Sequence, residues 1–359
     1  MVELVFLKIH HFTPGLDEQN ADEMTRRSLA YHLGRAGAKV KAAERFEGKL
    51  LKERHTGNVS RRKQTIKLGV SRTQDVNVGR WPRPVHNRKF SMSLPPAPVL
   101  PAPRVSVLMC FLNGAEFLAE ALASVRAQTW TDWELLLVDD GSTDGSVDLA
   151  RRATAPYADR VQLLVHPVHA NRGLSASRNL ALRHARGEYV AMLDADDVWR
   201  PTALARMVAM LEAAPEVALV GGNALRWYSW THDPADVAMD YAPTIARFGL
   251  ASPALLPPPQ LVHLLLQDPS ASPPTCSVLL RRAWLTKVSG FVDSFRTLYE
   301  DQALYCKLAL RAPVLLTNEV WAHYRRHNNS VCAQMYGTAD EVTSRQVFLD
   351  WLAAYAPEL

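Results

Sequence analysis

The amino-acid sequence predicts an α/β fold in which a mostly parallel sheet carries helices on both faces. Between residues 105 and 220, short apolar runs alternate with segments of helical pattern. Such an alternation is typical of strands joined by right-handed helical crossovers. The run 105–112 (VSVLMCFL) is continuously apolar, as expected of a parallel strand that is buried on both faces. Both observations indicate one sheet between two helical layers.

The elements follow from these patterns in chain order. The expected strands are 105–112, 134–138, 161–165, 189–193 and 217–220, and the expected helices after the second and third strands are 144–153 and 175–185. Asn113 stands three residues before Glu116, which is the spacing of a capping box, so a helix is expected to begin there. Pro201 suits the first turn of a later helix, where its missing N–H is harmless.

The chain before residue 105 has a different character. Residues 1–100 hold 19 Lys and Arg against 9 Asp and Glu, whereas residues 101–359 hold 22 against 27. We expect residues 1–92 to be a basic, disordered or loosely helical extension. Residues 93–104 contain five prolines and are expected to form a stiff linker. Positive charge alone suffices for nonspecific binding to nucleic acid or an anionic membrane, but the extension lacks interleaved aromatic residues, so we expect no specific nucleic acid partner.

The cysteines and the apolar runs bear on the compartment. The four cysteines form no C-x-x-C pair, which predicts buried thiols in a reducing compartment rather than a zinc site or a disulfide framework. No apolar run reaches the roughly 18 residues of a membrane span, and the first residues lack the basic leader of a signal peptide. We therefore predict a cytoplasmic protein, and leave open a peripheral association with the inner face of the membrane.

Acidic residues follow two of the predicted strands. The strand at 134–138 runs into Asp139 and Asp140, and the strand at 189–193 runs into Asp194 and Asp196. Ligands of parallel sheets bind beyond the carboxyl ends of the strands, so these side chains are expected at one edge. Clustered carboxylates repel one another, and a hard cation such as Mg²⁺ or Mn²⁺ relieves the repulsion. Because Mg²⁺ leaves much of its coordination shell to phosphate oxygens, the site suits a diphosphate.

Helix capping is the alternative explanation for some polar residues near these strand ends. Ser142 or Asp144 could cap the helix at 144–153, and Asp197 could cap the following helix. For Asp140, Asp194 and Asp196 taken together we favour a functional site.

Three segments carry motifs that go beyond these patterns. They are VSVLMCFLNGAEFLAEALASVRAQTWTDWELLLVDDGSTDGS, NRGLSASRNLALRHARGEYVAMLDADDVW and LYEDQALYCKLAL. In this order they resemble the family 2 glycosyltransferases, which have the GT-A fold of nucleotide-diphospho-sugar transferases, with a Rossmann-like sheet. The resemblance covers 105–335 and implies a catalytic domain with a nucleotide-binding half, 105–222, and an acceptor half, 223–335. A C-terminal helix is expected over 336–359.

The resemblance implies a role for each of four carboxylates. Asp140 would bind the pyrimidine base of the donor nucleotide, and Asp194 would lie beside its ribose. Asp196, the last Asp of the D-A-D element, would ligate the metal on the diphosphate. Asp301, in the Glu300-Asp301 pair, would be the general base.

Further residues match the lining of the donor pocket. Asn171, Gly173 and Arg178 fit the family's N-x-G-x-x-x-x-R-N stretch, and Arg178 would approach the nucleotide. A surface position on a helix is the alternative for Arg178.

Two departures from the family pattern stand out. Leu112 occupies the place of a tyrosine, so the phenol that usually meets the nucleotide is missing. The Gln-x-x-Arg-Trp motif of processive synthases is absent, and YRRHNNS instead resembles the ending of small non-processive members. In that motif Arg325, Arg326 or His327 could reach the departing diphosphate, and a structural role is the alternative for His327.

The predicted activity is hexosyl transfer from a nucleotide-diphosphate sugar, by resemblance a UDP-sugar, to the hydroxyl of a saccharide or glycoconjugate acceptor. One base and a metal-bound leaving group imply inversion, assisted by Mg²⁺ or Mn²⁺, in bacterial-type polysaccharide or glycoconjugate biosynthesis. The alternatives are transfer to polyprenyl phosphate and an inactive transferase-like binding domain. A pyrophosphorylase is disfavoured because Asn113-Gly114 is no glycine-rich phosphate loop.

Overall fold

The computed structural model describes residues 102–356. The predicted extension 1–92, the linker up to residue 101 and the last three residues of the predicted C-terminal helix lie outside the described residues. None of the helices between 102 and 356 combines the length and the apolar character that a membrane crossing requires.

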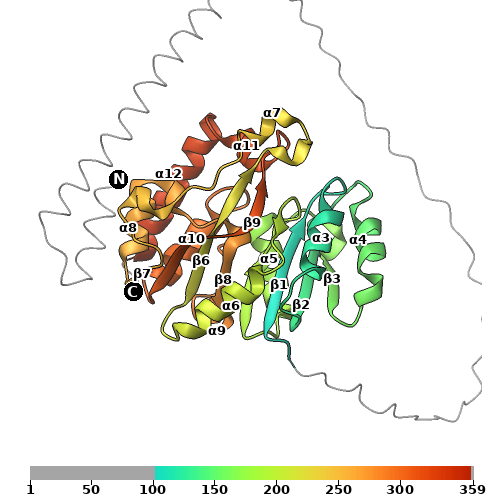
Figure 1. The fold of residues 1–359 in the computed structure, drawn as a ribbon, viewed down its shortest axis with the longest axis horizontal. Coiled ribbons are helices and arrows are strands. Elements are labelled where there is room, and N and C mark those ends of the chain that lie inside the picture. The colour runs from blue at the N-terminus through green and yellow to red at the C-terminus, as the bar shows by residue number, and fades with distance from the viewer. Residues whose placement is uncertain (1–101, 357–359) are drawn as a thin grey trace, which may run out of the picture. The chain divides into compact units, whose positions relative to one another are not determined.

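The described chain is organised around one sheet of nine strands (Figure 1). Their order is β3-β2-β1-β4-β8-β6-β9-β5, and β7 pairs with β9 outside this path. The strands are β1 (Val105–Phe111), β2 (Trp133–Asp139), β3 (Val161–Val165), β4 (Tyr189–Met192), β5 (Val198–Trp199), β6 (Leu219–Trp227), β7 (Ala254–Leu256), β8 (Val278–Arg281) and β9 (Val314–Arg325).

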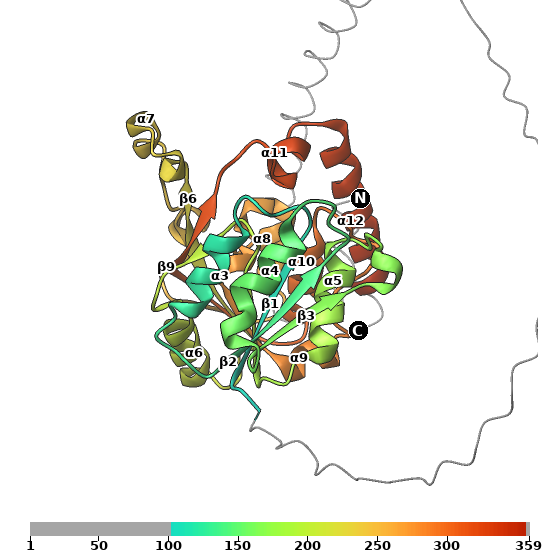
Figure 2. The same ribbon diagram turned by 90° about the vertical axis from the view of Figure 1, so that its right-hand side faces the viewer.

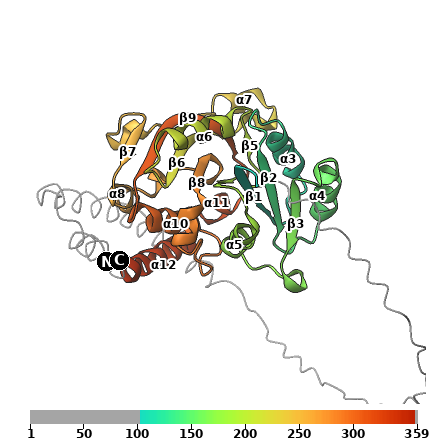
Figure 3. The ribbon, with the colours of Figure 1, turned by 90° about the horizontal axis from the view of Figure 1, so that it is seen from below.

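Helices cover both faces of this sheet (Figure 3). β6 leads into a segment that contains α7 and projects beyond the sheet (Figure 2). The helices are α3 (Leu118–Arg126), α4 (Ser146–Thr154), α5 (Leu174–His184), α6 (Ala203–Ala213), α7 (Pro234–Val237), α8 (Gln260–Gln267), α9 (Arg282–Lys287), α10 (Glu300–Ala309), α11 (Val331–Met335) and α12 (Ala339–Tyr355).

The predicted α/β fold is confirmed, and the sheet contains an antiparallel strand whose position in the sheet the sequence did not predict. β3, β2, β1 and β4 are all parallel, as the alternation predicts. The strand predicted at 217–220 corresponds to β6, which does not lie beside β4, because β8 is inserted between them and runs antiparallel to both. Periodicity along the chain cannot reveal this insertion, since β8 lies more than fifty residues further on and pairs only through long-range contacts.

Two apolar layers form because successive residues of a strand point to opposite faces of the sheet. In β1, Val107 and Met109 belong to the apolar layer that includes residues of α3, α4 and α6, whereas Leu108 and Cys110 belong to the layer that includes residues of α5, α8, α9, α10 and α12. All four side chains are buried, and each buried aliphatic side chain contributes about 1.5–3 kcal/mol. The central strands are therefore held on both faces, which fixes the loops at their carboxyl ends.

The expected capping box at Asn113 is wrong. α3 begins at Leu118, and no side chain caps its first turn. Asn113 instead has a positive φ of 52°. Its Oδ1 accepts from the backbone N–H of Thr143 at 2.8 Å, and its own N–H donates to Ser142 Oγ at 2.9 Å. The side chain that could have capped a helix joins the loop after β1 to the loop after β2.

The other capping candidates have mixed outcomes. Asp144 accepts from the backbone N–H of Ser146 at 2.9 Å, at the start of α4. Asp197 does not cap α6, whose first turn follows Thr202. All four cysteines are free, and three are buried, whereas Cys332 is only half-buried.

Gly187, just before β4, lies in close contact with the backbone of β1. A Cβ at this position would lie 2.6 Å from the backbone nitrogen of Ser106 and 2.9 Å from the carbonyl oxygen of Tyr189. Backbone atoms cannot yield as a flexible side chain does, so Gly187→Ala is expected to lower the free energy of unfolding by about 1–3 kcal/mol. Urea denaturation measures this. Gly145→Ala is the control, because a Cβ there meets nothing within 4 Å, and equal stability of the two variants would contradict the prediction.

Candidate active site

The carboxyl ends of β2 and β4 bring two acidic groups to the same edge of the sheet. β1 pairs in parallel with both strands, so Asp140 after β2 and Asp194 and Asp196 after β4 emerge on one side. Glu300 and Asp301 lie at the start of α10. Glu300 and Asp194 share the hydrogen-bond donor Arg178, so the start of α10 lies near Asp194. The sequence-predicted acids at 194, 196 and 301 therefore belong to one region.

Arg178 of α5 connects two of these acidic elements. Its Nη2 donates to Asp194 Oδ1 at 2.8 Å, and its Nη1 donates to Glu300 Oε1 at 3.0 Å. The residue is 2% exposed, so the surface position considered for it is wrong. Burial by itself would lower the pKa of Arg178, but Asp194 and Glu300 raise it well above its ordinary value. Arg178 is thus a permanent cation between the strand β4 and the helix α10.

Glu300 is buried, Asp301 is half-buried, and their charges repel each other. Burial, followed by the charge of Asp301, raises the pKa of Glu300 to about 7, although Arg178 opposes the shift. Burial also raises the pKa of Asp301 above its ordinary value, against the hydrogen bonds from the backbone of Gln302 and the hydroxyl of Ser272. Those two donors lie 2.7 Å from Oδ1 and 3.2 Å from Oδ2. The pair therefore takes up protons more readily than free carboxylates.

Asp194 and Asp196 have different surroundings. Asp194 Oδ2 accepts from the hydroxyl of Thr275 at 2.7 Å, so both of its oxygens have partners within the protein. Asp196 is more open, with a side chain that is 35% exposed and an Oδ2 that lies 3.1 Å from Nε2 of His327. Asp196 is the acid with room for a further ligand.

The next residue, Asp197, points into the protein. It is 1% exposed, and its Oδ1 accepts from the backbone N–H of Arg325 at 2.9 Å. Burial and then the charges of Asp196 and Asp194 raise its pKa well above the ordinary value. Asp197 holds the β4 loop against β9.

The three basic residues predicted near the diphosphate have different surroundings. Arg325 is 4% exposed, and its guanidinium lies within 4.6 Å of the ring centroids of Phe117 and Trp227. Its Nε donates to the backbone oxygen of Asp196 at 2.8 Å, so it supports the D-A-D loop from behind. His327 lies beside Asp196, whereas Arg326 packs over the ring of Tyr324 at 5.6 Å.

The aromatic residues near 227–230 surround Arg325. Trp227 and Trp230 both face its guanidinium, and Trp230 also donates from Nε1 to the backbone oxygen of Arg326 at 2.9 Å. These contacts give both rings a structural role around Arg325.

Asp140 is engaged by the loop that precedes α5. Its Oδ1 accepts from the backbone N–H of Arg172 at 2.7 Å, and its Oδ2 accepts from that of Gly173 at 2.9 Å. Asp140 is 6% exposed, whereas Asn171 is exposed and accepts from Arg296 at 3.0 Å. Gly173 has a φ of +88°, which favours glycine. Asp140 thus fixes the loop beside the predicted nucleotide pocket.

Leu112, at the position that departs from the family pattern, is 46% exposed at the end of β1. Sequence reasoning assigned no role to three further residues of this region. Glu300 pairs with Arg178, Ser272 donates to Asp301, and Thr275 donates to Asp194. Ser272 and Thr275 lie in an irregular segment without any motif, so only the folded chain reveals them.

The region offers a metal ion two side chains. Asp196 and His327 place a carboxylate oxygen and an imidazole nitrogen 3.1 Å apart. Within residues 102–356, no group of three or more His, Cys, Asp and Glu side chains is arranged to hold a metal by itself. A hard divalent ion that binds here fits if substrate phosphate and water supply its remaining ligands.

Comparisons with known proteins identify the family and the fold. Residues 106–258 match the sequence model of the family described as glycosyl transferase family 2. The mannosyltransferase PcManGT from Pyrobaculum calidifontis, solved in complex with GDP-Man and Mn²⁺, is 23% identical, and its match covers 74% of this chain and 67% of that one, with a TM-score of 0.51. At this identity the likeness shows the fold alone, which is the predicted GT-A fold.

Two relatives are more similar in sequence. The EpsE glycosyltransferase of Bacillus subtilis (strain 168) is 41% identical over 123 residues, which cover 34% of this chain and 44% of EpsE. The chain thus spans less than half the length of that relative. The uncharacterized glycosyltransferase alr2836 of Nostoc sp. is 30% identical over 246 residues, which cover 67% of this chain and 71% of that protein. Motifs, fold and relatives agree, and the chain belongs to family 2 of the glycosyltransferases.

Proposed function

We propose that this protein transfers a hexose from a nucleotide-diphosphate sugar, a UDP-sugar, to the hydroxyl of a saccharide or glycoconjugate with inversion. The observation that carries the proposal is the buried Arg178 bridge. Because it holds Asp194 and Glu300 together, the loop that carries Asp196 and the helix that carries Asp301 are fixed in one region. The same cation thus holds a donor-side acid and the residue next to the candidate base.

The donor side is formed by the edge of β1, β2 and β4. Asp196 and His327 would hold Mg²⁺ or Mn²⁺, which supplies positive charge to the leaving diphosphate when bound. Asp194 would accept from the ribose, and the loop fixed by Asp140 would line the base. The acids that follow β2 and β4 support this assignment, because α/β sheets, including those of GT-A folds, bind ligands at the carboxyl ends of their strands.

Asp301 would be the general base. In the transfer, the acceptor oxygen forms a bond to the anomeric carbon, the bond from that carbon to the diphosphate oxygen breaks, and the hydroxyl proton passes to Asp301. A base with a raised pKa is a stronger proton acceptor, and burial raises that of Asp301. Among the described residues, Asp301 Oδ2 accepts a single long hydrogen bond, 3.2 Å from Ser272 Oγ, which supports its availability to an acceptor.

The biological setting follows from the relatives at a coarser level. EpsE and the Nostoc protein are named as glycosyltransferases, and we infer a role in bacterial polysaccharide or glycoconjugate assembly. Transfer to polyprenyl phosphate uses the same donor chemistry and differs only in the acceptor.

Asp196→Ala tests the donor site. Because the substitution removes the more exposed carboxylate from the region, the affinity for UDP in the presence of Mn²⁺ is expected to fall by at least about tenfold. Isothermal titration calorimetry of UDP and GDP, each with Mn²⁺ and with a chelator, measures the effect and the base preference. Asp148→Ala, exposed on α4, is the matched control. Undiminished metal-dependent binding by Asp196→Ala would remove Asp196 from the metal site.

Asp301→Asn tests the base. The amide keeps the shape and an acceptor for Gln302 but cannot take a proton, so kcat is expected to fall by about 100- to 10,000-fold. UDP affinity is expected to stay unchanged. The measurement is the release of UDP from a panel of UDP-sugars, with water or added saccharide as acceptor, and Asp350→Asn, exposed on α12, is the control. Turnover retained by Asp301→Asn would show that another group takes the proton.

Glu300→Gln tests the ionisation of the buried pair. The pKa of Glu300 is raised from 4.5 to about 7, so the folded wild type holds an extra proton between these pH values. Its free energy of unfolding therefore falls as the pH rises from 4.5 through 7. The amide of the variant cannot titrate, so the fall should be smaller by at least about 1.4 kcal/mol, the equivalent of one pKa unit. Urea denaturation at about pH 5 and pH 7.5 measures both slopes, and parallel slopes would contradict the prediction.

A further inference from the structure

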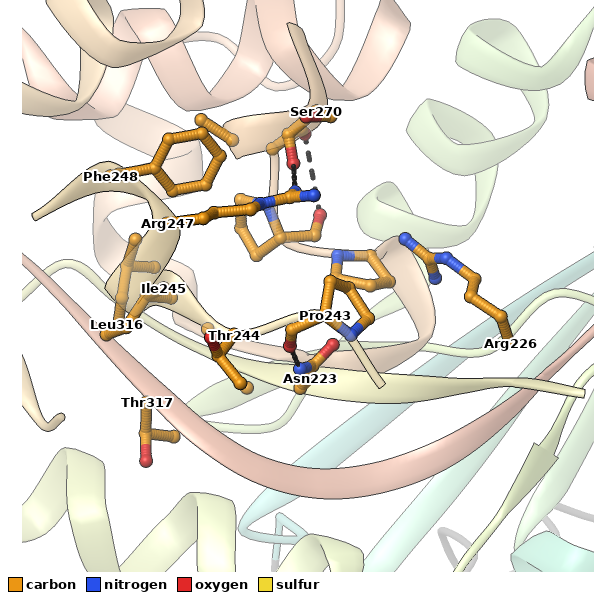
Figure 4. Close-up of a pocket in the computed structure, with 16 residues that line it drawn as sticks. Asn223, Arg226, Pro243, Thr244, Ile245, Arg247, Phe248, Ser270, Leu316 and Thr317 are labelled. Carbon is orange, nitrogen blue, oxygen red and sulfur yellow. Dashed lines mark hydrogen bonds between the residues drawn. The ribbon is translucent and has the colours of Figure 1, made fainter. Parts of the chain in front are cut away.

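A pocket lies on the acceptor half, between β6 and the segments around residues 243–248 and 270–274 (Figure 4). Sixteen residues line it, and they include two arginines but no Asp or Glu. Figure 4 shows the side chains of Arg226 and Arg247 approaching the pocket from opposite sides. Its lining is therefore positively charged, in contrast to the acidic region beside it.

The two arginines differ in how they are held. Arg247 donates from Nη2 to the backbone oxygen of Ser270 at 2.6 Å and lies over the ring of Phe248. Arg226 stacks over the ring of Tyr324 at 4.8 Å, and its buried Nη1 has no hydrogen-bond partner among residues 102–356. None of the ion pairs in that part of the chain includes Arg226. Because Nη1 itself is closed off from solvent, an anion in the pocket would meet the remaining N–H groups of Arg226, which lines the pocket.

The pocket is joined directly to the proposed reaction centre. Ser272 lines the pocket and donates to Asp301, and Thr275, three residues further on, donates to Asp194. Pro273 and Pro274, between them, also line the pocket. One hydrogen bond, from Ser272 to Asp301, therefore separates the lining of the pocket from the candidate base.

From this juxtaposition we propose that the pocket is an acceptor subsite that binds an anionic group, a carboxylate or phosphate, through Arg226. The inference rests on the proposed transferase function and names the substrate class: an acceptor that carries a negative charge near the hydroxyl that is glycosylated. Guanidinium groups bind carboxylate and phosphate through charge-assisted hydrogen bonds, often as bidentate pairs. An acidic sugar and a phosphorylated lipid or saccharide share this chemistry.

The test uses the full chain with its donor site filled by UDP and Mn²⁺, so that anionic probes cannot bind there. The probes are glucuronate, for a sugar carboxylate, and octyl phosphate, for a phosphate monoester. Glucose and octyl glucoside are their uncharged counterparts. Saturation-transfer NMR and calorimetry give the affinities. We expect at least one anionic probe to bind at least about tenfold more tightly than its uncharged counterpart.

Variants assign the binding to the pocket. Arg226→Gln is expected to lower the affinity for the anionic probe by at least about tenfold. Arg226→Lys is expected to retain part of that affinity because it keeps the charge. Arg183→Gln, which removes an exposed charge from α5, should have no effect. UDP titration and thermal denaturation of each variant report whether the fold and the donor site are intact.

Each outcome decides the proposal. Preference for glucuronate supports an acidic sugar as acceptor, and preference for octyl phosphate supports a phosphorylated one. Equal binding of charged and uncharged probes, or anion binding that Arg226→Gln leaves unchanged, would overturn the subsite. If metal-dependent UDP binding persists in that case, the transferase function stands and only the subsite falls. If the wild type itself does not bind UDP, the proposed transferase function on which the subsite rests is contradicted.

Discussion

The buried ion pairs of Arg178 are the interaction on which the site depends. One guanidinium, almost fully excluded from water, satisfies Asp194 at the end of β4 and Glu300 at the start of α10. Burying the charges of Arg178 and Glu300 is costly, and the cost is offset by the hydrogen-bonded ion pairs that Arg178 makes with both carboxylates. Removal of Arg178 would leave both carboxylates without their cation. The arrangement therefore fixes the position of each element more strongly than it stabilises the fold.

Much of the fold and part of the site were predictable from the sequence. Continuous apolar runs predict the parallel strands, because a strand without polar side chains on either face must be buried on both faces of its sheet. The acids that follow β2 and β4 were predicted at one edge, and β1 does pair in parallel with both strands. The remainder depends on contacts between distant segments. The insertion of β8, the burial of Arg178 and the hydrogen bonds of Ser272 and Thr275 have no signature within a local window.

Asn113 and Arg325 show why local patterns misassign polar residues. Asn113 fits a capping box, but its side-chain oxygen accepts from Thr143 and its backbone N–H donates to Ser142, both in the loop after β2. Arg325 fits a phosphate-binding cluster, yet Phe117, Trp227 and Trp230 enclose its guanidinium. In both cases the sequence correctly indicates a side chain with polar partners. Tertiary packing determines which partners Asn113 and Arg325 contact.

The segment from Ser272 to Thr275 acts as a rigid spacer between two carboxylates. Its ends donate to Asp301 and Asp194, and its middle consists of Pro273 and Pro274. Ser272 has φ −61° and ψ 123°, and Pro274 has φ −58° and ψ 137°, values close to the polyproline II conformation. Pyrrolidine rings lock φ. The separation of the two acids is therefore set in part by covalent ring geometry, which thermal motion of the surrounding loops changes little.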